Sequence, residues 1–118
     1  MTGDSGELLR ITTVSDGDTW AVSLAGELDL SSADQLDTTI AELCADGAER
    51  IVVEMGELHF MDSTGLRSLL VAAELCEVND CELMIGSTSL QVERLFSVSG
   101  VEGELPRRAQ AGDARGNL

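Results

Sequence analysis

The first third of the chain alternates apolar and polar residues in a way that predicts two β-strands. Residues 8–14 are rich in β-branched side chains. In residues 19–25 every second position is apolar, which places Trp20, Val22 and Leu24 on one face. Asp16-Gly17, between the two segments, is a dipeptide typical of hairpin turns. We therefore expect an antiparallel pair of strands, with the chain leaving the second strand over residues 26–30.

Three later segments space their apolar residues as helices do. The first is expected to begin with a capping box at Ser32 and to end at Gly47, and the second begins near Ser63. The third runs from a capping-box signature at residues 88–91 to Gly100. The predicted apolar faces comprise Ala33, Leu36, Ile40, Leu43 and Cys44, then Leu66, Leu69, Leu70 and Ala73, then Val92, Leu95 and Phe96.

Two further strands are expected between these helices. Ile51-Val52-Val53 is a short apolar run of the kind found in a central, doubly buried strand, and Cys81 to Ile85 forms another strand. Residues 54–61 are interpreted as a loop. The order β-β-α-β-α-β-α makes the strands that flank helices parallel. We predict an α/β fold with a mixed, mostly parallel sheet, an antiparallel N-terminal edge strand and helices largely on one face.

A length of 118 residues suits a single domain. We expect that domain to span residues 8–105. Residues 1–7 are polar and acidic, and they are expected to be a flexible N-terminus. From Pro106 the apolar periodicity stops, so residues 106–118 are expected to be a flexible tail.

The strongly acidic composition narrows the possible partners. The net charge is -15, with 22 acidic residues against seven arginines and no lysine. Binding to nucleic acid or to anionic membranes depends on basic residues, so neither partner is expected. The chain has neither an apolar run long enough for a transmembrane helix nor a signal peptide at its start, and we expect a cytoplasmic protein.

Cys44, Cys76 and Cys81 show no C-x-x-C spacing, and in a reducing compartment they are expected to be free thiols. We interpret them as small buried apolar residues. A regulatory disulfide between Cys76 and Cys81 stays open as an alternative, if a helix end meets a strand start.

The sequence lacks the usual signatures of catalysis and of cofactor binding. It contains no phosphate-binding glycine loop, and no acidic pair has a metal-binding spacing, so no cofactor and no metal are expected. Ser63 opens a helix as a hydrolase nucleophile does, but its segment lacks the first glycine of G-x-S-x-G. The single histidine, His59, is poorly placed to serve as its base. The chain is not expected to be an enzyme, and a small serine hydrolase is kept as an alternative.

Asp62-Ser63-Thr64-Gly65 is by local rules a helix start, because Asp, Ser and Thr are good N-caps. Gly65 is unfavourable in a first helical turn, by up to about 1 kcal/mol relative to Ala. A glycine is useful where another backbone must approach closely. This favours a docking site on the surface at this helix start.

Two motifs at this spacing carry a family resemblance. Gly26-Glu27-Leu28-Asp29 follows the second predicted strand, and Phe60-Met61-Asp62-Ser63-Thr64-Gly65-Leu66 precedes the second helix. Arg94-Leu95-Phe96 with Gly100 adds to the match, which extends from about Leu8 to Leu105. The chain resembles a STAS domain, specifically an anti-sigma factor antagonist. It departs from many such domains in showing no further helix after Pro106.

The resemblance implies a switch. Ser63 would be phosphorylated by an anti-sigma factor that is a serine kinase, and a serine phosphatase would remove the phosphate. The dephosphorylated antagonist would bind the anti-sigma factor and free the sigma factor. The residues expected to bind the partner are Asp29, Asp62, Ser63, Thr64, Gly65, Arg67 and Ser68, with Thr64, Arg67 and Ser68 on the exposed side of the helix. A STAS subunit of a transport or stress-sensing complex stays open as an alternative.

Overall fold

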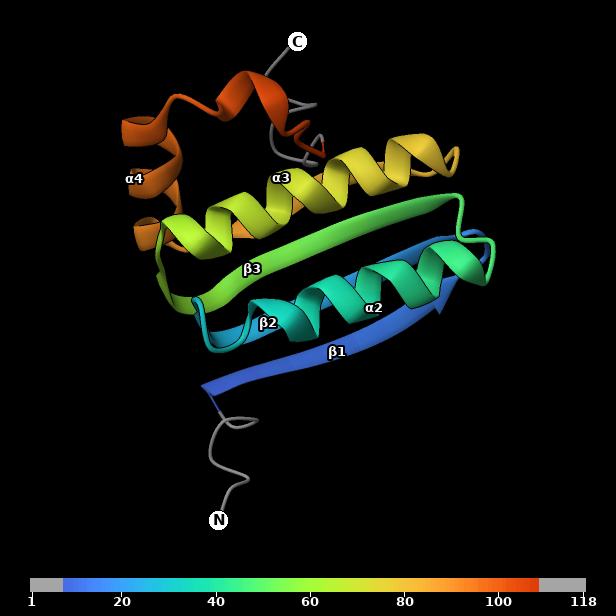
Figure 1. The fold of residues 1–118 in the computed structure, drawn as a ribbon, viewed down its shortest axis with the longest axis horizontal. Coiled ribbons are helices and arrows are strands. Elements are labelled where there is room, and N and C mark those ends of the chain that lie inside the picture. Colours follow the sequence, from blue (N-terminus) through green and yellow to red (C-terminus); the bar gives the residue numbers. More distant parts are fainter. Residues whose placement is uncertain (1–7, 109–118) are drawn as a thin grey trace, which may run out of the picture.

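The computed structural model of the chain describes residues 8–108, and its elements follow the predicted order. The predicted flexible ends, residues 1–7 and most of 106–118, lie outside the described residues. The elements, shown in Figure 1, are β1 (Leu9–Asp16), β2 (Thr19–Leu28), α2 (Ala33–Ala45), β3 (Arg50–Met61), α3 (Ser63–Val78), β4 (Glu82–Thr88), α4 (Leu90–Ser99) and a short 3-10 turn, η1 (Glu102–Glu104).

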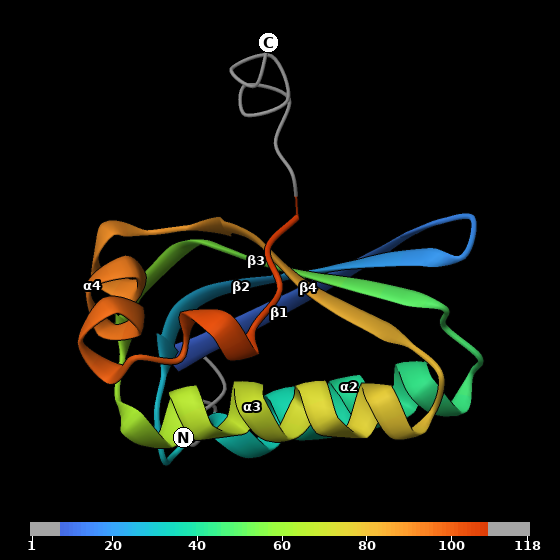
Figure 2. The same ribbon diagram turned by 90° about the horizontal axis from the view of Figure 1, so that it is seen from above.

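The four strands form one sheet in the order β1-β2-β3-β4. β1 pairs with β2 antiparallel, and the other two pairings are parallel, which confirms the predicted mixed sheet with an antiparallel edge strand. Helices α2 and α3 lie side by side on one face of the sheet, and both begin at the same end of it (Figures 1 and 2). Helix α4 lies at that end (Figure 2). The crossovers therefore place the start of α3 beside the loop that precedes α2.

Two strands are longer than the sequence predicted. β2 continues to Leu28 where the chain was expected to leave the sheet, and β3 includes residues 54–61, which were wrongly predicted to be a loop. Both strands contain register shifts, between Ser23 and Ala25 and between Val53 and Met55. A bulge of this kind shifts the alternation of inward and outward side chains, so the apolar pattern no longer has a period of two. This is the physical reason why the second half of β3 was missed.

Two predicted helix caps form in a different way. Helix α2 begins after Ser32, but the Ser32 hydroxyl makes no cap to the helix. It donates instead to the Glu27 carbonyl and accepts the Asp29 N–H. At α4 the cap is Ser89, whose hydroxyl accepts the Val92 N–H at 3.3 Å. Ser32 therefore fixes the loop before α2 without capping the helix, whereas Ser89 caps α4 from within the predicted segment 88–91.

The core lies between the sheet and the paired helices and consists mainly of aliphatic side chains, joined by Phe96. The face that α3 buries is rotated from the predicted one, because Ala72 and Cys76 are buried whereas Leu70 and Ala73 are partly exposed. Among residues 8–108, no helix is long and apolar enough to cross a membrane. The fully buried large side chains include Leu24, Leu28, Leu36, Ile40, Ile51, Leu69, Ile85 and Phe96.

The end of the described chain runs along β4. The Ile85 N–H donates to the Pro106 carbonyl at 2.7 Å, and the Arg108 N–H donates to the Ile85 carbonyl at 2.8 Å. The Arg108 guanidinium also pairs with Glu54 at 2.7 Å. Residues 106–108 are therefore held against the sheet, although the sequence analysis assigned them to the tail. The limit of the domain at residue 105 stays a prediction.

A close backbone approach sets the position of α3. The Asp62 N–H donates to the Leu28 carbonyl at 3.3 Å, which joins the start of α3 to the end of β2. A Cβ atom added to Gly65 would lie 2.4 Å from the Leu28 carbonyl oxygen and 3.0 Å from Met61 Cγ. Only glycine leaves room for this contact, so Gly65 lets the first turn of α3 lie against β2.

We expect Gly65→Ala to destabilise the domain by about 1–3 kcal/mol, because the new methyl group overpacks a backbone contact that cannot yield. The sign is informative, since Ala normally stabilises a helix relative to Gly by about 1 kcal/mol. Urea unfolding measures the difference in the free energy of unfolding.

Gly103→Ala is the matched control for this substitution, because a Cβ there meets nothing within 4 Å. It should change stability by less than about 0.5 kcal/mol. Equal stability of Gly65→Ala and the native chain would contradict the close approach.

Candidate functional site

The candidate site lies where β2 and β3 end on the same edge of the sheet. Leu28 pairs with Met61 in the parallel register, so Asp29 and Asp62 are the next residues on neighbouring strands. The loop after β2 and the start of α3 therefore emerge together, as predicted (Figure 1). This arrangement joins the two sequence motifs, which are more than 30 residues apart in the chain, into one surface.

Asp29 is held in a network of hydrogen bonds. One of its carboxylate oxygens accepts the Ser31 hydroxyl at 2.7 Å and the Ser31 N–H at 3.0 Å. The hydrogen bond from the Ser31 hydroxyl lowers the pKa of Asp29 and, with the other bonds to Ser31 and Ser32, outweighs the opposing effect of burial. The fully buried Ser32 ties the same loop to the end of β2 through the Glu27 carbonyl at 2.8 Å. The loop is therefore ordered and carries a negative charge.

Asp62 and Ser63 form the start of α3. Asp62 is the N-cap, and its carboxylate accepts the Gly65 N–H at 3.0 Å. Ser63 is the first residue of the helix and is exposed. The first N–H groups of a helix have no acceptor within it. Within residues 8–108 the N–H groups of Ser63 and Thr64 have no hydrogen-bond acceptor, so both are available to an anion at the helix start.

His59 is not organised as a base for Ser63. Its imidazole lies 3.6 Å from the Glu27 carboxylate, and its side chain is 69% exposed. In the part of the chain that the structure describes, the Ser63 hydroxyl has no hydrogen bond to any side chain. A serine nucleophile needs a base within hydrogen-bond reach, itself oriented by a third group. The geometry therefore gives no support to the hydrolase alternative.

The predicted partner-binding residues divide into exposed and buried ones. Ser63 and Arg67 are exposed, and Thr64 is partly exposed. Ser68 was wrongly placed on the exposed side of the helix, because it is buried and its hydroxyl donates to Asp37 of α2 at 2.6 Å. Gly65 is also buried, and the backbone that approaches it is that of β2 within the same chain. Ser68 and Gly65 therefore fix the position of α3 beneath the exposed residues and are not themselves part of the exposed surface.

Sequence reasoning missed two apolar residues at this edge. Leu30, in the loop after β2, is 78% exposed, and Phe60, near the end of β3, is 44% exposed. Exposed side chains of this size often mark an interaction surface. Leu30 carries a signal in the sequence, since it is an apolar residue in the segment 26–30, where the chain was expected to leave the sheet. Phe60 is the first residue of the motif that carries the family resemblance, but it was not counted among the partner-binding residues.

Comparison with known proteins matches this fold and these motifs. The family described as "Mlab, STAS domain" matches residues 11–107. An anti-sigma-B factor antagonist of Staphylococcus aureus is 31% identical over 94 residues, which cover 80% of this chain and 87% of that protein. The crystal structure of an anti-sigma factor antagonist from Mycobacterium paratuberculosis superposes with a TM-score of 0.77 at 20% identity, covering 93% of each chain.

The Bacillus cell fate determinant SpoIIAA, solved in its phosphorylated form, superposes with a TM-score of 0.63 at 23% identity, covering 92% of this chain and 97% of that one. The two solved structures establish the shared fold, and the Staphylococcus relative and the family match cover most of the chain. Antagonism of an anti-sigma factor is a regulatory role, which agrees with the expectation that the chain is not an enzyme. The chain belongs to the STAS-domain family of anti-sigma factor antagonists.

Proposed function

We propose that this chain binds an anti-sigma factor through the surface around Ser63 and thereby releases a sigma factor. The main support for the proposal is that the motif after β2 and the motif before α3 lie at the same edge of the sheet. This arrangement places the exposed Ser63 beside an ordered acidic loop. The curated relatives, named anti-sigma-B factor antagonists, support the identity of the partner. We place this exchange of partners in the cytoplasm, where sigma factors act.

Exposed Leu30 and Phe60 provide the apolar part of the proposed contact. Interfaces gain most of their affinity from a few well-buried side chains, often apolar or aromatic, surrounded by a polar rim. Asp29, Asp62, Thr64 and Arg67 form the rim in this proposal. The net charge of -15 favours a partner with a basic or mixed surface.

The second part of the proposal is that phosphorylation of Ser63 switches this binding off. The anti-sigma factor itself is proposed to be the serine kinase, and a serine phosphatase reverses the modification. A relative by fold, SpoIIAA, has been solved in a phosphorylated form, which agrees with such a cycle. The exposed hydroxyl of Ser63 gives a kinase access to its acceptor.

The fold tolerates the phosphate whereas the interface does not. A phosphoserine carries about -1.5 to -2 charges, and the N-terminus of a helix stabilises an anion through its free N–H groups and its dipole. Arg67 lies one helical turn from Ser63, on the same side of α3, and adds a positive charge. At an interface, the same dianion costs desolvation and is repelled by Asp29 and Asp62. The switch thus acts by charge and leaves the fold intact.

We expect Ser63→Asp to weaken binding to the anti-sigma factor by at least about tenfold, whereas Ser63→Ala binds as the native chain does. Isothermal titration calorimetry with the purified anti-sigma factor measures both dissociation constants. Incubation of that factor and ATP with the native chain, followed by mass spectrometry, should place one phosphate on Ser63.

Ser15→Asp, at an exposed position of β1 at the end of the sheet opposite the candidate site, makes the same chemical change and should not alter the affinity. Equal affinities of Ser63→Asp and Ser63→Ala would exclude the charge switch. Phosphate on Thr64 in place of Ser63 would reassign the acceptor.

We expect Leu30→Ser to weaken the complex by about 1–2 kcal/mol, roughly five- to thirtyfold, because it removes an apolar side chain that the partner buries. Val78→Ser is the matched control, since Val78 is 81% exposed and is the last residue of α3, at the end of that helix remote from Ser63. The same calorimetric titration measures both. Unchanged affinity of Leu30→Ser would exclude Leu30 from the interface.

A further inference from the structure

Three thiols gather at the end of the helix pair that is remote from Ser63. Cys44 lies in the last turn of α2, Cys76 in the last turn of α3, and Cys81 directly before β4. Their sulfur atoms all lie within 4.8 Å of one another, and those of Cys44 and Cys76 are 3.8 Å apart. Cys76 and Cys81 are buried and Cys44 is partly exposed, and all three are free thiols.

These separations match those of a metal site with thiolate ligands. At a metal–sulfur distance of about 2.3 Å, the sulfur atoms of a tetrahedral site are about 3.8 Å apart and those of a trigonal site about 4.0 Å. The Cys44–Cys76 distance already has this value. A disulfide, in contrast, requires the two sulfur atoms to approach to about 2.05 Å. The cluster therefore needs less movement to hold a cation than to form a disulfide.

The backbone holds Cys81 against Cys76. The Cys81 N–H donates to the Cys76 carbonyl at 2.8 Å, which closes the loop between α3 and β4 into a tight turn. Asp80, within that loop, has a φ of 58°, a left-handed conformation that few non-glycine residues adopt. Two of the three thiols are thus fixed by local structure, and packing of α2 against α3 brings the third.

The two helix ends that carry Cys44 and Cys76 supply no basic side chain to stabilise thiolates. Neither α2 nor α3 has a basic residue in its last turn, although helix C-termini favour cations. Burial raises the pKa of Cys76, and the neighbouring thiols raise it further. Burial likewise raises the pKa of Cys81. The raised pKa keeps Cys76 and Cys81 protonated without a cation and makes them poor nucleophiles for disulfide exchange.

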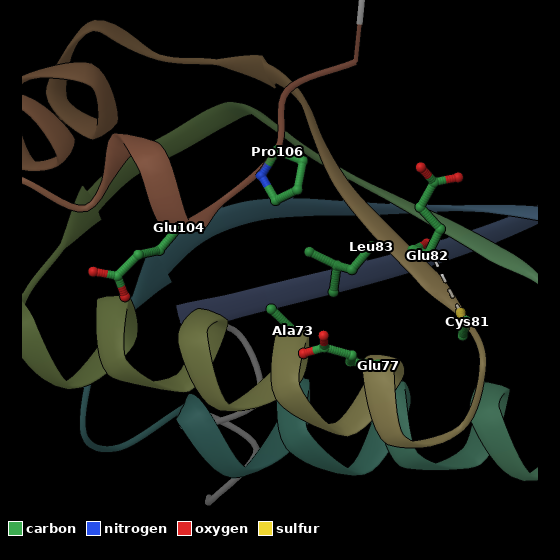
Figure 3. A pocket seen from close by; sticks show the side chains of 7 residues that line it. All are labelled: Ala73, Glu77, Cys81, Glu82, Leu83, Glu104 and Pro106. Carbon is green, nitrogen blue, oxygen red and sulfur yellow. Dashed lines mark hydrogen bonds between the residues drawn. The ribbon is translucent and has the colours of Figure 1, made fainter.

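A hollow leads to this end of the molecule. Its volume is about 340 Å³, and Figure 3 shows Cys81 at its rim together with the carboxylates of Glu77 and Glu82. Glu82 is paired with Arg50 at 2.9 Å, whereas Glu77 has no ion pair within residues 8–108. Acidic side chains beside the opening attract cations from solution.

We propose that Cys44, Cys76 and Cys81 form a three-thiolate site for one thiophilic divalent cation of the Zn²⁺ type. Binding forms three metal–sulfur bonds and releases three thiol protons to solvent, with no change in oxidation state. A water molecule supplies the fourth ligand, as in other zinc sites with three protein ligands. The cation would join α2, α3 and β4 at the end opposite the candidate site.

Titration of the reduced full-length chain with Co²⁺ tests the site, because cobalt thiolates absorb strongly through sulfur-to-metal charge transfer. We expect one Co²⁺ per chain, loss of the absorption when Zn²⁺ is added, and release of three protons in a weakly buffered solution. Zn²⁺ at 100 times its dissociation constant should raise the thermal midpoint of unfolding by about 10 °C or more. Absence of the charge-transfer absorption, or fewer than two protons released, would overturn the proposal.

Cys44→Ala keeps the buried core intact, since Cys44 is partly exposed. Loss of a residue that only supports a metal ligand typically weakens metal binding by about 10- to 100-fold. Loss of a ligand itself should cost more, so we expect Co²⁺ binding to weaken by more than about 100-fold. His59→Ala is the control and should leave the titration unchanged, because His59 lies on β3 outside the cluster. Unaltered absorption in Cys44→Ala, or a mass two units lower that reveals a disulfide in the purified chain, would refute the three-thiolate site.

Discussion

The contact between the Leu28 carbonyl and the first turn of α3 is the one on which the candidate site depends. The carbonyl accepts the Asp62 N–H and lies against Gly65, so the end of β2 and the first turn of α3 are fixed to one another. The loop that carries Asp29 follows Leu28 directly, so the same contact fixes where this loop begins. Because a side chain at Gly65 would occupy the space of the carbonyl, one glycine keeps two motifs distant in sequence within one surface.

The position of Ser63 suits the proposed phosphorylation in two ways, one that concerns the fold and one that concerns the surface. The free N–H groups at the start of α3 can donate hydrogen bonds to a phosphate without rearrangement of the core. The carboxylates of Asp29 and Asp62, which are held by hydrogen bonds, keep the surroundings of that phosphate negative. In the proposed switch, the partner would meet a changed charge on an unchanged shape. Within residues 8–108 no base is organised at Ser63, which fits the proposal, since a hydroxyl that receives phosphate from a kinase needs no activation by this chain.

The order of elements, the mixed sheet and the edge at which the two motifs meet were predictable, because apolar periodicity and turn residues report on local structure. The second half of β3 was not, since its register shift breaks the period of two on which strand prediction rests. Ser68 was misplaced because its burial depends on Asp37 of another helix, and a single helical period does not reveal such a partner. The sequence left open an approach of Cys76 to Cys81, but the addition of Cys44 depends on the packing of α2 against α3, which no local spacing reveals. In each case a contact between distant segments decided the outcome.

The bond between Ser68 and Asp37 has a consequence for how this surface engages a partner. It joins α3 to α2 beneath the exposed residues, and the hydrogen-bonded loop at Asp29 extends the same continuous framework. A surface built in this way loses little conformational entropy when it is covered, so little of the binding free energy is spent on ordering it. For the proposed complex, association would approach that of two rigid bodies, and a phosphate at the helix start would act on the rate at which the partners separate.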